Sequence, residues 1–220
     1  MTYLIISDFH LNHKVSTKEL KFYKQLFLSV DKIIINGDFW EGMRPIANID
    51  KFIKSQWNEL LQILKDKSAI YIFGNHDFYE IDEQEKALWL TEAQKVFSSI
   101  SHEYRLNLGN KVYKIIHGSQ FRHPFMINSA LFEYLYYKVS KLVSKTFLGS
   151  RIYNFIGGKW NRRIIETVIP TLQSNEILIC GDTHAPMKSD RYINTGFNFS
   201  GNYGYLILTD NFEKLYFGRM

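Results

Sequence analysis

Four short apolar runs recur along the chain, and polar residues directly follow each of them. They occupy residues 3–7, 32–36, 69–73 and 176–180. Apolar runs of about four to eight residues bounded by turn-forming residues predict buried β-strands. Each predicted strand would therefore end in a loop of polar residues.

Apolar residues at helical spacing lie between these runs. One set follows Ser16 and Glu19, which have the spacing of a helix capping box. Strands that alternate with helices indicate the α/β class. The first set is Leu20, Tyr23, Leu26 and Phe27, and the second is Phe52, Ile53, Trp57, Leu60, Leu61 and Leu64.

The second half of the chain predicts further strands and one insertion. Gly109 and Asn110 have the composition of a hairpin turn that joins residues 104–108 to 112–116. Short strands are predicted at 192–195, 203–208 and 214–217, so the sheets are mixed. Residues 121–168 show helical spacing and no strand pattern. We therefore expect one domain over residues 1–220, with a helical insertion at about 121–168.

The composition fits a folded protein. Of 220 residues, 45% are hydrophobic and 22% are charged. The one cysteine, Cys180, cannot form an intrachain disulfide, so a reducing compartment is expected. The first ten residues lack the basic leader of a secretory signal, and no apolar stretch approaches the roughly 18–20 residues of a bilayer span. These features predict a cytoplasmic protein.

The net charge of +5 comes from the insertion. Residues 122–163 hold eight basic residues and one acidic residue, a net +7, whereas the rest of the chain sums to −2. Nine aromatic residues are interleaved with these cations. One interpretation is a helical cap with solvated lysines. The other is a lid that contacts an anionic membrane surface, or a substrate with acyl chains and phosphates, because apolar burial and charge attraction add.

Five polar clusters stand at the carboxyl ends of predicted strands, the edge where open α/β sheets bind ligands. Taken singly, such clusters are commonly helix caps or turns. Together they supply carboxylate, imidazole and amide oxygen donors, which suit divalent metals. The clusters are Asp8-Phe9-His10, Gly37-Asp38, Gly74-Asn75-His76-Asp77, His117-Gly118 and Gly181-Asp182-Thr183-His184.

In this order the motifs DFH, GDFW, GNHDF, HG and GDTHAP resemble those of the calcineurin-like metallophosphoesterase family, over residues 8–186. The resemblance implies a sandwich of two mixed β-sheets flanked by helices, with two metal ions at one sheet edge. It also assigns the ligands by position. These are Asp8, His10 and His184 for the first metal, Asp38 for both metals, and Asn75, His117 and Asp182 for the second.

Asp182 departs from the family pattern, which usually has histidine at this position. Aspartate is an oxygen ligand and adds a negative charge, so it favours Mn²⁺ or Mg²⁺ over Zn²⁺. We therefore expect two divalent ions, with Mn²⁺ preferred and Mg²⁺, Fe or Zn²⁺ as alternatives. The other interpretation is a weakened or empty second site.

The same resemblance places His76 beside the metals without binding one, so His76 is the candidate general acid. Asp77 could orient this imidazole or cap a helix. Arg122 and His123 closely follow the His117 loop. They are candidates for binding substrate phosphate, with solvated surface positions as the alternative.

The position of the insertion also resembles that in UDP-2,3-diacylglucosamine pyrophosphatases, in which a helical lid receives the acyl chains. This resemblance implies hydrolysis of a lipid-linked nucleotide sugar by a peripheral protein at the inner face of the membrane. Many of those enzymes have arginine at the position of His76.

Three alternatives stay open. They are a hydrolase of soluble nucleotides, phosphodiesters or phosphoproteins, a Mn²⁺-dependent nuclease, and a non-enzymatic scaffold of the same fold. Nucleic acid is the less expected partner, although basic aromatic surfaces also bind single strands. The nearly complete ligand set argues against a scaffold. The sequence leaves the oligomeric state open.

Overall fold

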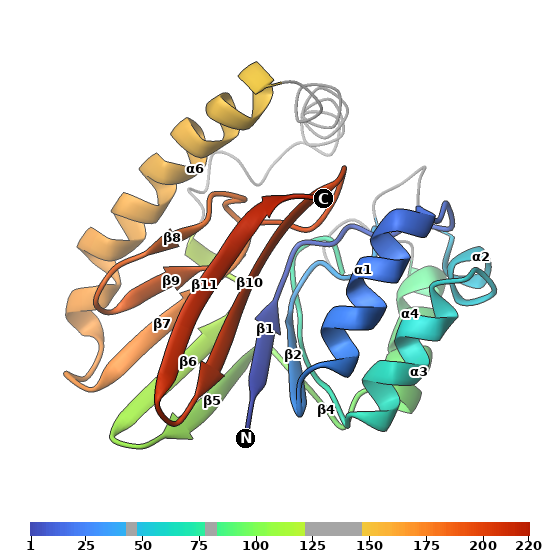
Figure 1. Cartoon of the computed structure of the whole chain (residues 1–220), viewed down its shortest axis with the longest axis horizontal. Coiled ribbons are helices and arrows are strands. Elements are labelled where there is room, and N and C mark those ends of the chain that lie inside the picture. The colour runs from blue at the N-terminus through green and yellow to red at the C-terminus, as the bar shows by residue number, and fades with distance from the viewer. Residues whose placement is uncertain (43–47, 78–82, 122–146) are drawn as a thin grey trace.

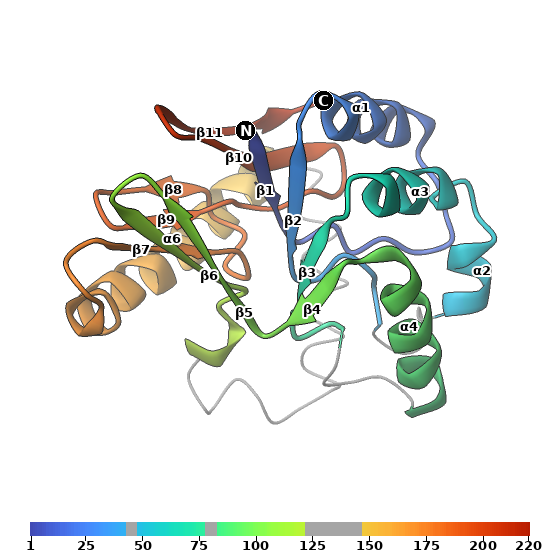
Figure 2. The same ribbon diagram turned by 90° about the horizontal axis from the view of Figure 1, so that it is seen from below.

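The computed structural model describes residues 1–42, 48–77, 83–121 and 147–220. Two β-sheets lie face to face, and helices cover their outer faces (Figure 1). The second view looks along the layers and shows helices on both sides of the pair of sheets (Figure 2). The predicted α/β sandwich of two mixed sheets is therefore confirmed.

The first sheet has six strands in the order β11-β10-β1-β2-β3-β4. Strands β1 to β4 run parallel, and β10 pairs antiparallel with both β1 and β11. The strands are β1 (Tyr3–Ile6), β2 (Lys32–Asn36), β3 (Ile70–Ile72), β4 (Ser99–Ser101), β10 (Asn202–Thr209) and β11 (Phe212–Arg219).

The second sheet has five strands in the order β5-β6-β7-β9-β8. Strands β6, β7 and β9 run parallel, and β5 and β8 are antiparallel edge strands. The strands are β5 (Glu103–Leu108), β6 (Lys111–Ile116), β7 (Glu176–Cys180), β8 (Met187–Lys188) and β9 (Tyr192–Asn194).

The helices fall on two sides of the sheets. Helices α1 to α4 lie beside the first sheet, and α6 lies along the second (Figures 1 and 2). No helix in the described part of the chain is long and apolar enough to cross a bilayer. The helices are α1 (Thr17–Leu28), α2 (Ile49–Ile53), α3 (Asn58–Asp66), α4 (Glu83–Val96) and α6 (Phe147–Thr167), with short 3-10 turns η1 (Ser119–Phe121) and η3 (Ile169–Thr171).

Strand β1 shows why the apolar runs are continuous. Leu4 and Ile6 pack on the side of the helices, and Ile5 packs between the two sheets. Strands that are buried on both faces need apolar residues at every position. A third cluster joins Ile164 of α6 to Leu178 of β7, so α6 is anchored on the outer face of the second sheet.

The predicted elements agree with the structure except where packing divides or adds an element. The apolar set at 52–64 forms two helices, α2 and α3, because the chain turns at Ser55, whose hydroxyl donates to the carbonyl oxygen of Phe52 at 2.6 Å. Ser16 caps α1 by accepting from the N–H of Glu19 at 3.3 Å. The Glu19 carboxylate instead accepts from the N–H of Gly201, so the reciprocal half of the capping box is missing.

Apart from the two 3-10 turns, three described elements were not predicted, namely α4, β4 and β8. Helix α4 buries only Trp89 and Ala93 along its length, so its apolar spacing is weak. The predicted insertion is helical over α6, and its part at residues 122–146 lies outside the described residues.

Candidate metal centre

Loops that follow five strands meet at one edge of the two sheets. Strands β1, β2 and β3 are parallel in the first sheet, and β6 and β7 are parallel in the second. Their carboxyl ends bring together all seven predicted metal ligands. His184 is partly buried. The other six are buried, and they are Asp8, His10, Asp38, Asn75, His117 and Asp182.

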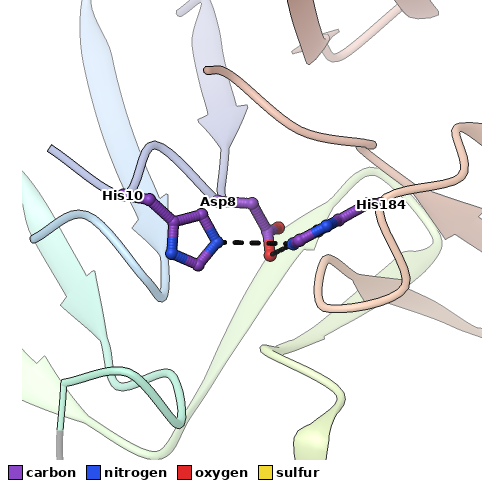
Figure 3. Close-up of side chains that lie close together, drawn as sticks. All are labelled: Asp8, His10 and His184. Atoms are coloured by element: carbon purple, nitrogen blue, oxygen red, sulfur yellow. Dashed lines mark hydrogen bonds and ion pairs between the residues drawn. The ribbon is translucent and has the colours of Figure 1, made fainter. Parts of the chain in front are cut away.

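Asp8, His10 and His184 form the first group of candidate ligands, and their polar atoms point toward one another (Figure 3). Nε2 of His184 lies 3.2 Å from Oδ1 of Asp8 and 3.3 Å from Nε2 of His10. Donors from two loops that are far apart in the sequence thus face one point. This convergence is what a metal site requires.

Asp38 lies between this group and a second one. Its Oδ2 is 3.8 Å from Nε2 of His10 and 3.2 Å from Nε2 of His117. Nε2 of His117 is also 3.7 Å from Oδ1 of Asp182. Nδ1 of His117 is 2.8 Å from the carbonyl oxygen of Asn36 and donates to it, so Nε2 is the ring nitrogen that faces the carboxylates.

The environment of the Asn75 side chain shows whether a cation suits the site at this sheet edge. Asn75 is 8% exposed, and its Oδ1 has no hydrogen-bond donor among the residues that the structure describes. Buried polar atoms without a partner are rare, and a cation would satisfy this oxygen. Carboxylate, imidazole and amide oxygen donors therefore fit divalent ions at the two groups.

Five of the predicted ligands share a strained backbone conformation with positive φ. Non-glycine residues rarely adopt positive φ, and each such residue costs about 1–3 kcal/mol. Strain of this kind concentrates at sites where the fold holds side chains for a function. Five predicted ligands have it, with φ of 56° at Asp8, 48° at His10, 52° at Asp38, 62° at Asp182 and 56° at His184.

Two motif glycines give the ligands room. A Cβ at Gly74 would lie 2.0 Å from Oδ1 of Asp38, and a Cβ at Gly181 would lie 2.3 Å from Oδ2 of Asp8. No side chain fits at either distance, so only glycine allows the backbone to approach these carboxylates.

Neighbouring charges shift the pKa values in the cluster. Burial raises the pKa of Asp38, but the His117 and His76 imidazoles outweigh it and hold the pKa well below its usual range. Burial lowers the pKa of His117, yet Asp38 and Asp8 outweigh that effect and raise it well above its usual value. Asp38 is therefore ionised at neutral pH, the form that binds a cation.

Glu41, which the sequence pattern did not single out, is the acid beside His76. Its Oε1 is 3.0 Å from Nδ1 of His76, and its Oε2 is 3.3 Å from Nδ1 of His10. Burial raises the pKa of Glu41, but the two imidazoles outweigh it and lower the pKa to about 2. The only signal in the sequence was an acid three residues after Asp38, beyond the strand-end motif.

Asp77, the residue predicted to orient His76 or to cap a helix, is fully buried and contacts the backbone of two motif loops. Its Oδ2 accepts from the backbone N–H of Asp38 at 3.0 Å and of Gly74 at 2.8 Å. Burial and the negative charge of Asp38 raise the pKa of Asp77 to about 7. Asp77 thus ties two motif loops together. The alternative of a helix cap concerns residues 78–82, which lie outside the described residues, as do Arg122 and His123.

Helix α6 braces the loop that carries His184. The side-chain amide of Asn161 donates to the carbonyl oxygen of Ala185 at 2.8 Å. Its Oδ1 accepts from the hydroxyls of Thr183 at 2.9 Å and Tyr192 at 2.7 Å. Asn161 is fully buried, although a single polar residue in a helical pattern predicts no such role.

Two aromatic rings from the loop after β9 cover the first group of ligands. The Phe199 centroid is 5.2 Å from that of His10 and 5.4 Å from that of His184. Phe197 packs on His184 at 5.6 Å. These rings form an apolar wall at the site that the sequence analysis also did not identify.

Comparison with known proteins gives one family match. A family model described as Calcineurin-like phosphoesterase matches residues 1–186, a span that includes all seven predicted ligands. No curated protein is a significant match.

Several solved structures of low sequence identity are similar to this chain. An archaeal phosphodiesterase is similar over 100% of both chains, with 15% identity and a TM-score of 0.50. The phosphoesterase Yfce from E. coli is similar over 96% of this chain and 90% of its own, with 16% identity and a TM-score of 0.49. A dimetal phosphatase from Danio rerio is similar over 94% and 91%, with 10% identity and a TM-score of 0.47.

Proposed function

Because the chain belongs to the calcineurin-like phosphoesterase family, we propose that it hydrolyses the pyrophosphate of UDP-2,3-diacylglucosamine or a similar lipid-linked nucleotide sugar. Membership of the family makes the chain a metal-dependent phosphohydrolase. The lipid-linked substrate and the site of action, at the anionic cytoplasmic face of a membrane, are the proposal. The observation that supports this substrate most strongly is that helix α6 exposes large apolar side chains and is hydrogen-bonded to the loop of His184.

The residues at the sheet edge would hold two ions, for which we propose Mn²⁺ because Asp182 adds a charged oxygen donor. Such ions, when bound, supply a nucleophile at neutral pH and neutralise phosphoryl oxygens. Asp8, His10 and His184 would hold the first ion, Asp38 both, and Asn75, His117 and Asp182 the second.

His76 is the proposed proton donor to the leaving oxygen. The hydrogen bond between its Nδ1 and Glu41 fixes the orientation of the ring. A fixed imidazole beside the ligands can transfer its proton without first having to reorient. The rings of Phe197 and Phe199 cover one side of the same edge, which limits the access of bulk water.

The surface of α6 supports a substrate that has both acyl chains and phosphates. Phe155 is 60% exposed and Ile156 is 37% exposed, although both are large apolar side chains. Lys159, Arg162 and Arg163 are exposed on the same helix, and Nζ of Lys159 lies 4.5 Å over the Phe155 ring. Apolar groups beside cations suit an anionic lipid surface.

The test compares a lipid substrate with a soluble one. The wild-type protein is assayed on UDP-2,3-diacylglucosamine and on bis(p-nitrophenyl) phosphate, each with Mn²⁺, with Mg²⁺ or with chelator, and Asp38→Ala is the inactive control. Turnover of the lipid, lost with chelator and in the variant, supports the proposal. Turnover of the soluble diester alone would leave a phosphoesterase and overturn the lipid substrate.

Two matched surface variants test the part played by α6. Phe155→Ser and Phe212→Ser each remove an exposed aromatic ring, one on α6 and one on β11. We expect Phe155→Ser to raise the KM for the lipid and leave the soluble diester unchanged, and Phe212→Ser to change neither. An equal effect of the two variants on the lipid would contradict an acyl-chain contact at α6.

A further inference from the structure

Three buried polar side chains connect helix α6 to the loop of residues 181–185. Asn161 lies on α6, and Tyr192 and Asn194 lie on β9. All three are fully buried. Buried polar groups are costly unless each has a hydrogen-bond partner, and a satisfied network holds the chain in one arrangement. The partners of these three side chains therefore identify the segment that the network holds.

The network holds the loop on either side of its two candidate ligands. The side-chain amide of Asn194 donates to the carbonyl oxygen of Gly181 at 2.6 Å. The side-chain amide of Asn161 donates to the carbonyl oxygen of Ala185 at 2.8 Å. The hydroxyl of Tyr192 joins these two ends, because it donates to Oδ1 of Asn161 at 2.7 Å and accepts from the amide of Asn194 at 3.3 Å. Both ends of the loop thus belong to one connected set of hydrogen bonds.

The two ligands on this loop have a backbone conformation that needs support. The φ angle is 62° at Asp182 and 56° at His184. Positive φ is unfavourable for a residue with a side chain, and it persists only where the surrounding structure holds it. His184 belongs to the first group of candidate ligands and Asp182 to the second. A shift of this one loop would therefore move a ligand of each ion.

Helix α6 presents one face to the loop and another to solvent. Gly157, Asn161 and Ile164 are buried, and their spacing of four and three residues places them on one face of the helix. A Cβ at Gly157 would lie 2.3 Å from the carbonyl oxygen of Thr183, so the helix backbone rests directly on the loop. Phe155 is exposed. The face that contacts the loop and the exposed side chains therefore belong to the same helix.

We propose that Asn161 is a positioning residue that couples the docking of α6 on the second sheet to metal binding at both candidate sites. When α6 is docked, Asn161 holds the loop so that Asp182 and His184 face the other ligands. Linkage is reciprocal, so a helix that strengthens metal binding when it is docked is itself held more firmly once the metal is bound. The coupling does not depend on which phosphoester is hydrolysed.

Two substitutions weaken the network to different degrees. Asn161→Leu removes its hydrogen bonds with little change in volume. Tyr192→Phe is milder, because it removes only the hydroxyl that joins Asn161 to Asn194. Tyr113→Phe is the matched control, since Tyr113 is also buried but its hydroxyl donates to Glu213 at 2.7 Å. If Asn161→Leu does not fold, as judged by its circular dichroism spectrum, Tyr192→Phe takes its place in every comparison.

Metal affinity is measured by calorimetry on metal-free protein without substrate. Mn²⁺ should bind Asn161→Leu about 5–150-fold more weakly than the wild type, which is the usual size of coupling between two sites. Tyr192→Phe should also bind Mn²⁺ more weakly, and Tyr113→Phe should match the wild type.

The reciprocal effect is measured by hydrogen exchange with mass spectrometry. Saturating Mn²⁺ should slow exchange in residues 155–167 of the wild type more than in α3, which lies on the other side of the sheets (Figure 1). This difference between the two helices should be smaller in Asn161→Leu, because the helix then no longer responds to the loop.

Wild-type Mn²⁺ affinity in Asn161→Leu would overturn the proposal, since a purely structural residue would lower the Tm of the metal-free protein and leave the affinity unchanged. Equal slowing of exchange in α6 and α3 of the wild type would also overturn it, as would an equal loss of affinity in Tyr192→Phe and Tyr113→Phe. Absence of Mn²⁺ binding to the wild type would overturn both this proposal and the metal centre. A wild type that binds Mn²⁺ but hydrolyses no phosphoester would refute the proposed function alone, and the affinity and exchange comparisons would still decide the role of Asn161.

Discussion

Two adjacent glycines in helix α6 provide a test of how closely this helix holds the metal-binding loop. A Cβ at Gly157 would lie 2.3 Å from the carbonyl oxygen of Thr183 and 2.6 Å from Cβ of Ala185. A Cβ at Gly158 would meet nothing within 4 Å. Both glycines are inside the same helix, so alanine changes the helix propensity equally at the two positions. The pair therefore isolates the contact with the loop.

The expected difference follows from two opposing effects. Gly158→Ala should raise the free energy of unfolding by about 0.5–1 kcal/mol, the advantage of alanine over glycine inside a helix. Gly157→Ala gains the same propensity but forces a methyl group against the loop backbone, and such overpacking costs about 1–3 kcal/mol. At about 2–4 °C per kcal/mol, Gly157→Ala should melt about 2–12 °C below Gly158→Ala.

Thermal unfolding followed by circular dichroism measures this difference, with and without Mn²⁺. Because the same loop carries His184, added Mn²⁺ should also raise the Tm less in Gly157→Ala than in Gly158→Ala. Equal melting temperatures for the two variants would refute the reasoning that α6 rests on the loop. An equal response to Mn²⁺ would show that the contact does not reach the metal site.

Three further predictions concern the metal centre. His76→Ala should lower kcat by about 10²–10⁴-fold, which is the usual contribution of general acid catalysis, and should keep its metal content. Retained turnover in steady-state assays would contradict the role of His76 as the general acid. Asp182→His should shift the metal preference from Mn²⁺ toward Zn²⁺, because a nitrogen replaces a charged oxygen. Unchanged metal content by elemental analysis would show that residue 182 does not select the ion. At a Mn²⁺ concentration of about a hundred times its Kd, binding should add about 2.7 kcal/mol to the free energy of unfolding. Removing the metal with a chelator should therefore lower the Tm by about 5–11 °C. Identical melting curves with Mn²⁺ and with chelator would contradict a metal centre.

The strands that carry the site could be predicted because they are buried on both faces. Strands β2 and β7 have the predicted bounds, and Asp38 and Asp182 follow them within two residues. Local patterns failed where packing decides the outcome. The apolar set at 52–64 divides into two helices at Ser55, and α4 has too few buried positions for a clear period.

The sequence by itself determined the α/β class and the approximate positions of the strands, and the resemblance of its short motifs to a family assigned the seven candidate ligands. Apolar runs and short motifs are local properties of the chain. Only the tertiary structure decided that Glu41 lies between His76 and His10, and that Asn161 holds the loop of His184. These contacts join segments that are distant in the sequence. They depend on strand register and on how α6 packs against the sheet, and neither is encoded in a local pattern of residues.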